Sequence, residues 1–242
     1  MYSYCMRPAV EKQDNAFAQY GTLAHQLIEG WAKGTLLPFD LGFEWEQRYP
    51  IVVTEPFPYA SKGYDVRYYE AGKKYFDSFS GFGENWNVVS VEEEFFSTIG
   101  GYLFRGFADL LLRHEPSGEL MLVDHKSTSA SSLKKSEVKH SHQTYLYAGM
   151  VQEKYGQYPS ILQLNYFKAG KPRIVPFCKE DYAETIRWAT DIAAEISFEQ
   201  EFPRREDFYF CNNLCSVRNF CARCHLQEQI DSGELPPFGL NV

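Results

Sequence analysis

The stretch GFADLLLRHEPSGELMLVDHK, residues 106–126, predicts the centre of the fold. Two apolar runs meet at the turn Pro116-Ser117-Gly118, which is typical of a β-hairpin with one or both faces buried. Because side chains alternate along a strand, Asp124 and Lys126 share one face of the second run, and Asp109 in the first run can face them across the sheet. Burying two carboxylates and an ammonium group together is unfavourable unless a cation or a ligand compensates them. The stretch therefore predicts a metal site on a buried hairpin.

Outside the hairpin, helical and strand patterns follow one another along the chain. The helices expected from the apolar period cover residues 17–31, 65–80, 137–152 and 179–198. The strands expected from short apolar runs cover residues 88–96, 161–167 and 174–177. Residues 35–65 are rich in Pro, Gly and aromatic residues and are predicted to be mostly irregular. This order indicates an α/β fold with a central mixed β-sheet flanked by helices.

The composition is that of a globular protein with an acidic charge balance. A net charge of −8 argues against nucleic-acid binding over the whole surface, so any phosphate contact is expected to be local and sensitive to salt. The sequence has no apolar run long enough to span a bilayer and no signal peptide at its start, so we expect an intracellular, cytoplasmic protein without membrane contact.

The arrangement of Asp109, a turn and Asp124-His125-Lys126 resembles the core of the PD-(D/E)XK nucleases, in their RecB-like branch. The resemblance implies a restriction-endonuclease-like core and a hydrolase of phosphodiester bonds. It also implies that Asp109 and Asp124 are ligands of Mg²⁺ or Mn²⁺ and that Lys126 holds the attacking water. The chemistry agrees, because two carboxylates with water suit Mg²⁺ and a bound cation lowers the pKa of water. A surface hairpin with a salt bridge is the alternative interpretation of the same residues.

Further positions extend the resemblance. Gln143 and Tyr147 are four residues apart on one expected helix face, and they match a Gln-x-x-x-Tyr pair that positions the DNA phosphate beside the metal in RecB-like nucleases. His25 follows Gly21-Thr22 as in the N-terminal motif of that branch, where the histidine is an additional metal ligand. An imidazole ligand suits Mn²⁺ alongside Mg²⁺. Glu93 or Glu94 matches an acidic position of some members, and the acidic run 92–94 leaves the assignment open.

The cysteines form a second candidate metal centre. Cys5 near the start, with Cys211, Cys215 and Cys221 near the end, resembles the 4Fe–4S ligand set of AddB-type and CRISPR-associated adaptation nucleases. These four are our expected ligands. The spacing between the first two late cysteines is three residues where the family commonly has two, so replacement of Cys211 by Cys224 stays open. Zn²⁺ bound by the four late cysteines is the alternative.

The resemblance extends over most of the chain, so we expect residues 1–242 to form one nuclease domain. Its expected parts are a helical region 1–84, a catalytic core 85–200, and a cysteine-rich tail 201–242 that packs with the N-terminus. The expected function is that of a DNA exonuclease using one or two Mg²⁺ or Mn²⁺ ions on single-stranded DNA or free ends. The sequence lacks a P-loop, so a helicase or a recombination or CRISPR protein is an expected partner, and phages are one expected source. The alternatives are an inactive nuclease-like subunit for nucleic-acid binding or assembly, and a zinc-stabilised interaction protein.

Overall fold

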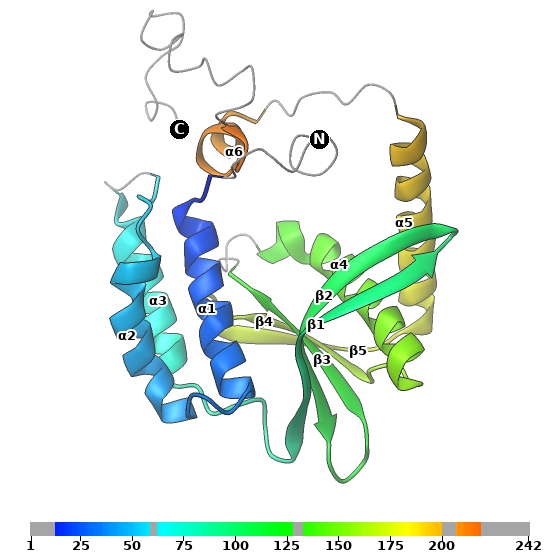
Figure 1. Ribbon diagram of the computed structural model, residues 1–242, viewed down its shortest axis with the longest axis horizontal. Helices are drawn as coiled ribbons and strands as arrows, with labels where there is room; N and C mark the ends of the chain where they lie inside the picture. The colour runs from blue at the N-terminus through cyan, green and yellow to red at the C-terminus, as the bar shows by residue number, and fades with distance from the viewer. Residues whose placement is uncertain (1–12, 59–61, 128–132, 200–206, 219–242) are drawn as a thin grey trace, which may run out of the picture.

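A five-stranded sheet lies between two groups of helices (Figure 1). The computed structural model describes residues 13–58, 62–127, 133–199 and 207–218. The strands lie in chain order across the sheet, as β1 (Trp86–Ile99), β2 (Tyr102–His114), β3 (Leu120–Lys126), β4 (Ile161–Tyr166) and β5 (Lys171–Pro176). The helices are α1 (Ala16–Ala32), α2 (Leu41–Val52), α3 (Tyr64–Asp77), α4 (Leu133–Tyr155), α5 (Lys179–Phe198) and the short α6 (Phe208–Asn213), with a 3₁₀ turn at Pro38–Asp40.

One parallel pair makes the sheet mixed. β3 and β4 are parallel, whereas the other neighbouring strands are antiparallel. Parallel neighbours need a crossover connection, and α4 supplies it between β3 and β4. The predicted α/β fold with a mixed sheet and flanking helices is therefore confirmed, and it is consistent with a restriction-endonuclease-like core.

Each face of the sheet is buried by its own helices. On one face Leu110, Leu112 and Val123 pack with Trp31 of α1. On the other face the alternate residues Leu111 and Leu122 pack with α4 in a second cluster. Because both faces of β2 and β3 are covered, these strands form the rigid wall on which polar side chains can be held in fixed positions.

The sequence of α1 explains how it begins, ends and faces the sheet. The Asn15 side chain caps its start by accepting a hydrogen bond from the Ala18 N–H at 3.0 Å. Gly34, at φ 73°, follows its last turn, where a glycine readily adopts the left-handed conformation. The buried apolar positions recur at helical spacing and are Ala16, Tyr20, Leu23, Ala24, Leu27 and Ile28. His25 lies beside this stripe, half-buried, and so faces the edge of the core rather than its centre.

The prediction that residues 35–65 are mostly irregular is wrong, because α2 occupies residues 41–52. Leu41, Trp45 and the half-buried Tyr49 recur every four residues and form a narrow apolar stripe. Trp45 is fully buried against Tyr20, with ring centroids 5.3 Å apart. Tertiary packing of this stripe therefore stabilises a helix that contains Pro50 in its last turn.

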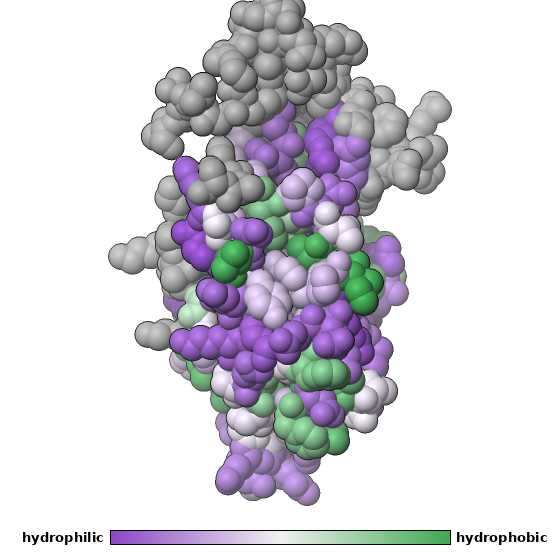
Figure 2. Space-filling model, turned by 90° about the vertical axis from the view of Figure 1, so that its left-hand side faces the viewer, coloured by the Kyte–Doolittle hydropathy of each residue, from purple (hydrophilic) through white to green (hydrophobic). Residues whose placement is uncertain are grey.

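Figure 2 faces α2 and α3 and shows hydrophobic spots separated by hydrophilic surface. Large exposed apolar side chains on α2, α3 and the turn before α2 are Phe39, Phe43, Ile51 and Val66. Scattered apolar side chains of this kind are ordinary on a protein surface. Among the described helices, none combines the length and apolar character that a membrane crossing requires.

Candidate active site

The two aspartates of the hairpin lie where β2 and β3 separate. The paired ladder of these strands ends at Leu110 and Val123, one residue before Asp109 and Asp124. Beyond that point the Asp109 carboxylate accepts a hydrogen bond from the backbone N–H of His125 at 2.6 Å. The side chain thus replaces a ladder bond and fixes the carboxylate beside Asp124, which is 1% exposed.

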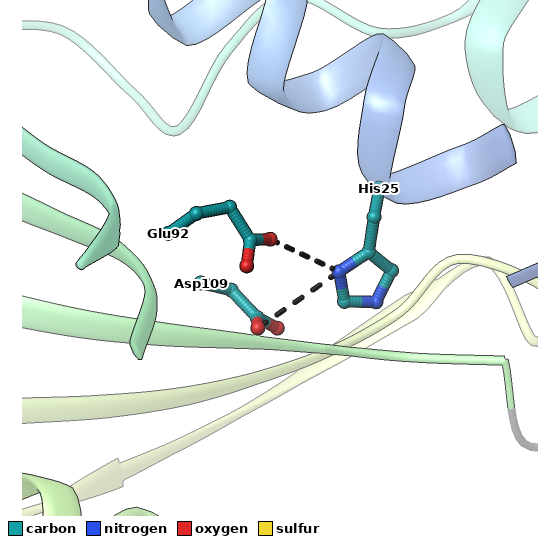
Figure 3. Close-up of side chains that lie close together, drawn as sticks. All are labelled: His25, Glu92 and Asp109. Carbon is teal, nitrogen blue, oxygen red and sulfur yellow. Dashed lines mark hydrogen bonds and ion pairs between the residues drawn. The ribbon is translucent and has the colours of Figure 1, made fainter. Parts of the chain in front are cut away.

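Glu92 completes an acidic cluster through an irregularity in β1. Its neighbours pair regularly, Val91 with Leu110 and Glu93 with Ala108, but Glu92 itself has φ 47°, which is uncommon for a residue with a Cβ atom. Figure 3 shows the carboxylates of Glu92 and Asp109 pointing at the ring of His25. The distances from His25 Nδ1 are 3.4 Å to Glu92 Oε1 and 3.8 Å to Asp109 Oδ1. One ligand atom from each residue lies within 4.8 Å of the others, so the three can bind a metal ion together.

A line of polar contacts runs from Asp124 to α4. Lys126 Nζ lies 2.6 Å from Asp124 Oδ2 and donates to Gln143 Oε1 at 2.8 Å. The Gln143 amide in turn donates to the Tyr147 hydroxyl at 2.9 Å. Gln143 and Tyr147 are one helical turn apart and face the sheet together. The contacts hold the Lys126 ammonium in one position at the edge of the acidic cluster.

Gly106 makes room for this arrangement. A methyl group at Gly106 would overlap the ring of Tyr147. The ring therefore lies directly on the β2 backbone, three residues before Asp109. A glycine at this position permits the close approach of α4 that brings Tyr147 and Gln143 to Lys126.

The buried charges change the proton affinities of the cluster. Burial raises the pKa of Asp109 to about 7, and Asp124 and Glu92 add to this effect, while His25 and the His125 N–H oppose it. Burial also raises the pKa of Asp124, although Lys126 opposes the shift. For His25, burial alone would lower the pKa, but the carboxylates of Glu92, Asp109 and Asp124 together raise it. The fold holds these carboxylates close together although their negative charges repel one another. With the imidazole of His25 they form a set of ligands that suits Mg²⁺ or Mn²⁺.

The site opens to solvent beside α1. A cavity of about 480 Å³ is lined by Gly21, Thr22, His25 and Gln26 of α1, together with Glu92 and Ser127. The side chains of His25 and Glu92 are about one-third exposed, whereas Asp109 is 12% exposed. A ligand that enters the cavity therefore meets His25 and Glu92 first, and the aspartates lie deeper.

The structure brings together the residues of the predicted site. They are His25, Asp109, Asp124, Lys126, Gln143 and Tyr147. Sequence reasoning missed Glu92, for which it offered Glu93 or Glu94. In the structure Glu93 contacts Lys154 and Tyr155, and Glu94 contacts Arg105. The acidic run was the signal, but only the left-handed backbone at Glu92 directs one member to His25.

The predicted cysteine centre is described only in part. Cys211 and Cys215 are half-buried cysteines in and just after α6. Cys5, Cys221 and Cys224 lie outside the described residues. The first described residue of the chain does reach this region, since the Gln13 N–H donates to the Ser216 carbonyl at 2.7 Å.

Comparison with known proteins shows the family of this chain. The sequence profile of the PD-(D/E)XK nuclease superfamily matches residues 1–222, and the chain belongs to this superfamily. Membership indicates a hydrolase of phosphodiester bonds with a nucleic-acid substrate. Among solved structures, a Eubacterium rectale protein provisionally described as an exonuclease is similar, with a TM-score of 0.42 and 10% identity over 83% of this chain and 74% of that chain. A comparison with curated proteins finds no significant match.

Proposed function

We propose that the chain is a metal-dependent DNA nuclease that acts as an exonuclease on single-stranded DNA or free ends. One observation carries the proposal: His25, Glu92 and Asp109 converge within 4.8 Å beside the Asp124 and Lys126 pair, in a chain that belongs to a nuclease superfamily. His25, Glu92 and Asp109, with Asp124, would hold Mg²⁺ or Mn²⁺. A bound cation would neutralise charge on the scissile phosphate and lower the pKa of the attacking water.

The protein side chains supply orientation. Lys126 would hold the attacking water and counter the negative charge that develops on the phosphate. Its ammonium is already fixed by Asp124 and Gln143, so little of its side-chain freedom is lost when the substrate binds. The Gln143 and Tyr147 pair would position the phosphate beside the cation.

The site is reached through an open cavity. Its volume is about 480 Å³, and Ala18, Gly21 and Thr22 of α1 line it. The preference for a single strand or a free end rests on the resemblance to RecB-like nucleases, and a panel of DNA substrates tests it.

The decisive assay uses end-labelled single strands, linear duplex and closed circular DNA, each with Mg²⁺ or Mn²⁺. We expect the linear substrates to be shortened from an end and the circles to resist. Lys126→Ala should lower the rate at least about 100-fold, and the matched control Lys179→Ala, at an exposed position on α5, should not change it. Equal cleavage by both variants would refute the assignment of Lys126 to the active site. DNA binding without cleavage, at every metal concentration, would favour the inactive subunit.

We further propose a 4Fe–4S cluster held by Cys5, Cys211, Cys215 and Cys221, in a single domain whose tail packs with the N-terminus. The contact of Gln13 with Ser216, and that of the Arg218 guanidinium with the Asp14 carbonyl at 3.4 Å, support this association. Protein purified without oxygen should absorb near ~400 nm and contain iron and sulfide. A colourless protein that contains zinc would instead support a zinc site.

A further inference from the structure

A second cavity lies on the face of the sheet opposite the catalytic carboxylates. It has a volume of about 610 Å³ and lies between the end of α3, the segment after it, and the β4–β5 hairpin. Asn165 lines it and pairs in register with His125 on β3. Because His125 alternates with Asp124 and Lys126, the cavity and the two aspartates lie on opposite faces of the sheet. His25 of the acidic cluster contacts His125, with ring centroids 5.5 Å apart.

The floor of this cavity carries polar groups that can both donate and accept. Gln163 is 7% exposed, and its amide has no hydrogen-bond partner among the described residues. The Asn165 amide nitrogen uses both of its hydrogens, on Tyr75 Oη at 2.8 Å and on His125 Nδ1 at 2.9 Å. The Asn165 carbonyl and the Tyr75 hydroxyl proton therefore remain available beside the Gln163 amide. The Gln163 amide lines the cavity, so its N–H and C=O groups can pair with a ligand that enters it.

The walls and the charge of the cavity narrow the class of ligand. Phe79 and Phe82 are half-buried aromatic walls. Among its described lining residues the charged ones are Lys74 and Lys168, and none of these residues has a carboxylate. The positive charge of this lining differs from the net charge of the chain, which is −8. It also differs from the mouth of the metal site, which is lined by Glu29 and Glu92. The cavity therefore suits an anionic ligand with a flat ring that carries hydrogen-bond donors and acceptors.

We propose that this cavity binds a free nucleoside monophosphate. An amide such as that of Gln163 matches the donor and acceptor edge of adenine, and Phe79 and Phe82 supply aromatic contact surface for the base. Lys74, exposed on α3, is the cation for the phosphate. The volume is within the range of small-ligand sites. The proposal goes beyond the proposed function and does not depend on nuclease activity.

The test is isothermal titration of the whole protein with adenosine 5′-monophosphate (AMP) in EDTA, so that no metal can recruit the phosphate. We expect AMP to bind the wild-type protein, and Gln163→Met to weaken binding about tenfold. Methionine keeps the volume and removes an unpartnered amide, so thermal unfolding should occur at the same or a higher temperature. Unchanged AMP affinity in folded Gln163→Met, or failure of the wild type to bind millimolar AMP, would overturn the proposal.

Neighbouring lysines give a matched control for the phosphate. Lys74 lines the cavity, whereas Lys73, on the same helix, is paired with Asp77 at 2.6 Å. Lys74→Ala should weaken AMP binding about fivefold and leave adenosine binding unchanged, and Lys73→Ala should affect neither. Equal effects of the two lysine variants would contradict a local phosphate contact.

Two further arms identify the ligand source and the place of binding. A 5′-phosphorylated oligonucleotide should bind more weakly than AMP, and tighter binding would assign the cavity to a strand end instead of a free nucleotide. His25→Ala should bind AMP as the wild type does, and loss of binding would move the nucleotide to the metal site.

Discussion

Replacing Asp109 by Asn should stabilise the metal-free protein, and more so at high pH. The pKa of Asp109 is about 7, against an ordinary value of 3.8. Between these values the folded protein holds a proton that the unfolded chain has already lost, so stability falls as pH rises through this window. Asparagine is neutral throughout, and its carbonyl can still accept the hydrogen bond from the His125 N–H.

The magnitude follows from the size of the shift. Each pKa unit corresponds to about 1.4 kcal/mol, so ionising Asp109 in the folded protein costs up to roughly 4 kcal/mol above pH 7. At pH 5 the wild type bears less than half of this penalty. The free energy of unfolding of Asp109→Asn should therefore exceed that of the wild type by roughly 2 kcal/mol more at pH 8 than at pH 5.

Denaturant unfolding in EDTA at the two pH values measures this difference. Asp191→Asn is the matched control, because Asp191 is exposed on α5. With added Mn²⁺ the order should reverse, since a ligand that binds only the folded wild type stabilises it and the variant lacks one carboxylate. Equal changes at pH 5 and pH 8, or no difference from the Asp191→Asn control, would refute a destabilising charge at Asp109.

Three other substitutions test the contacts around the site. Gly106→Ala should displace the Tyr147 ring, lower the free energy of unfolding by about 1–3 kcal/mol and reduce cleavage, and unchanged unfolding would contradict the close contact. Tyr147→Phe removes the hydroxyl that accepts from Gln143 but keeps the ring, so kcat should fall about tenfold with little change in thermal unfolding. Glu92→Gln should weaken Mn²⁺ binding, measured by titration. The control Glu93→Gln, which alters the contact with Lys154, should leave Mn²⁺ binding unchanged. Equal effects of the two variants would show that Glu92 is not a metal ligand.

Local sequence pattern was sufficient to predict the hairpin and much of the spatial arrangement of the candidate site. The alternation of residues 120–126 put Asp124 and Lys126 on one strand face, and the four-residue spacing put Gln143 and Tyr147 on one helix face. The structure joins these pairs through the Lys126 to Gln143 hydrogen bond. Regular periodicity therefore carries most of the information about which side chains face one another.

What the sequence did not reveal depends on packing between distant segments. The stripe of α2 is narrow, and its stability comes from burying Trp45 against Tyr20 of α1 and Phe76 of α3. For the acidic run, a regular strand would direct residues 92 and 94 to one face and residue 93 to the other. The positive φ of Glu92 breaks this alternation, and a backbone irregularity of that kind is set by tertiary structure rather than by local residue preferences.

The candidate site lies where several local regularities fail together. Glu92 adopts a left-handed conformation, Asp109 takes a hydrogen bond that the ladder would otherwise use, and Gly106 lacks the side chain that a strand residue normally packs. The backbone conformation of Glu92 is unfavourable alone, by about 1–3 kcal/mol, and burial of the Asp109 carboxylate is unfavourable as well. They persist because the apolar residues of β2 and β3 are buried on both faces directly beside them. A rigid core thus holds a strained and charged cluster that does not stabilise the fold by itself. This arrangement is expected at a site where a bound cation stabilises the cluster.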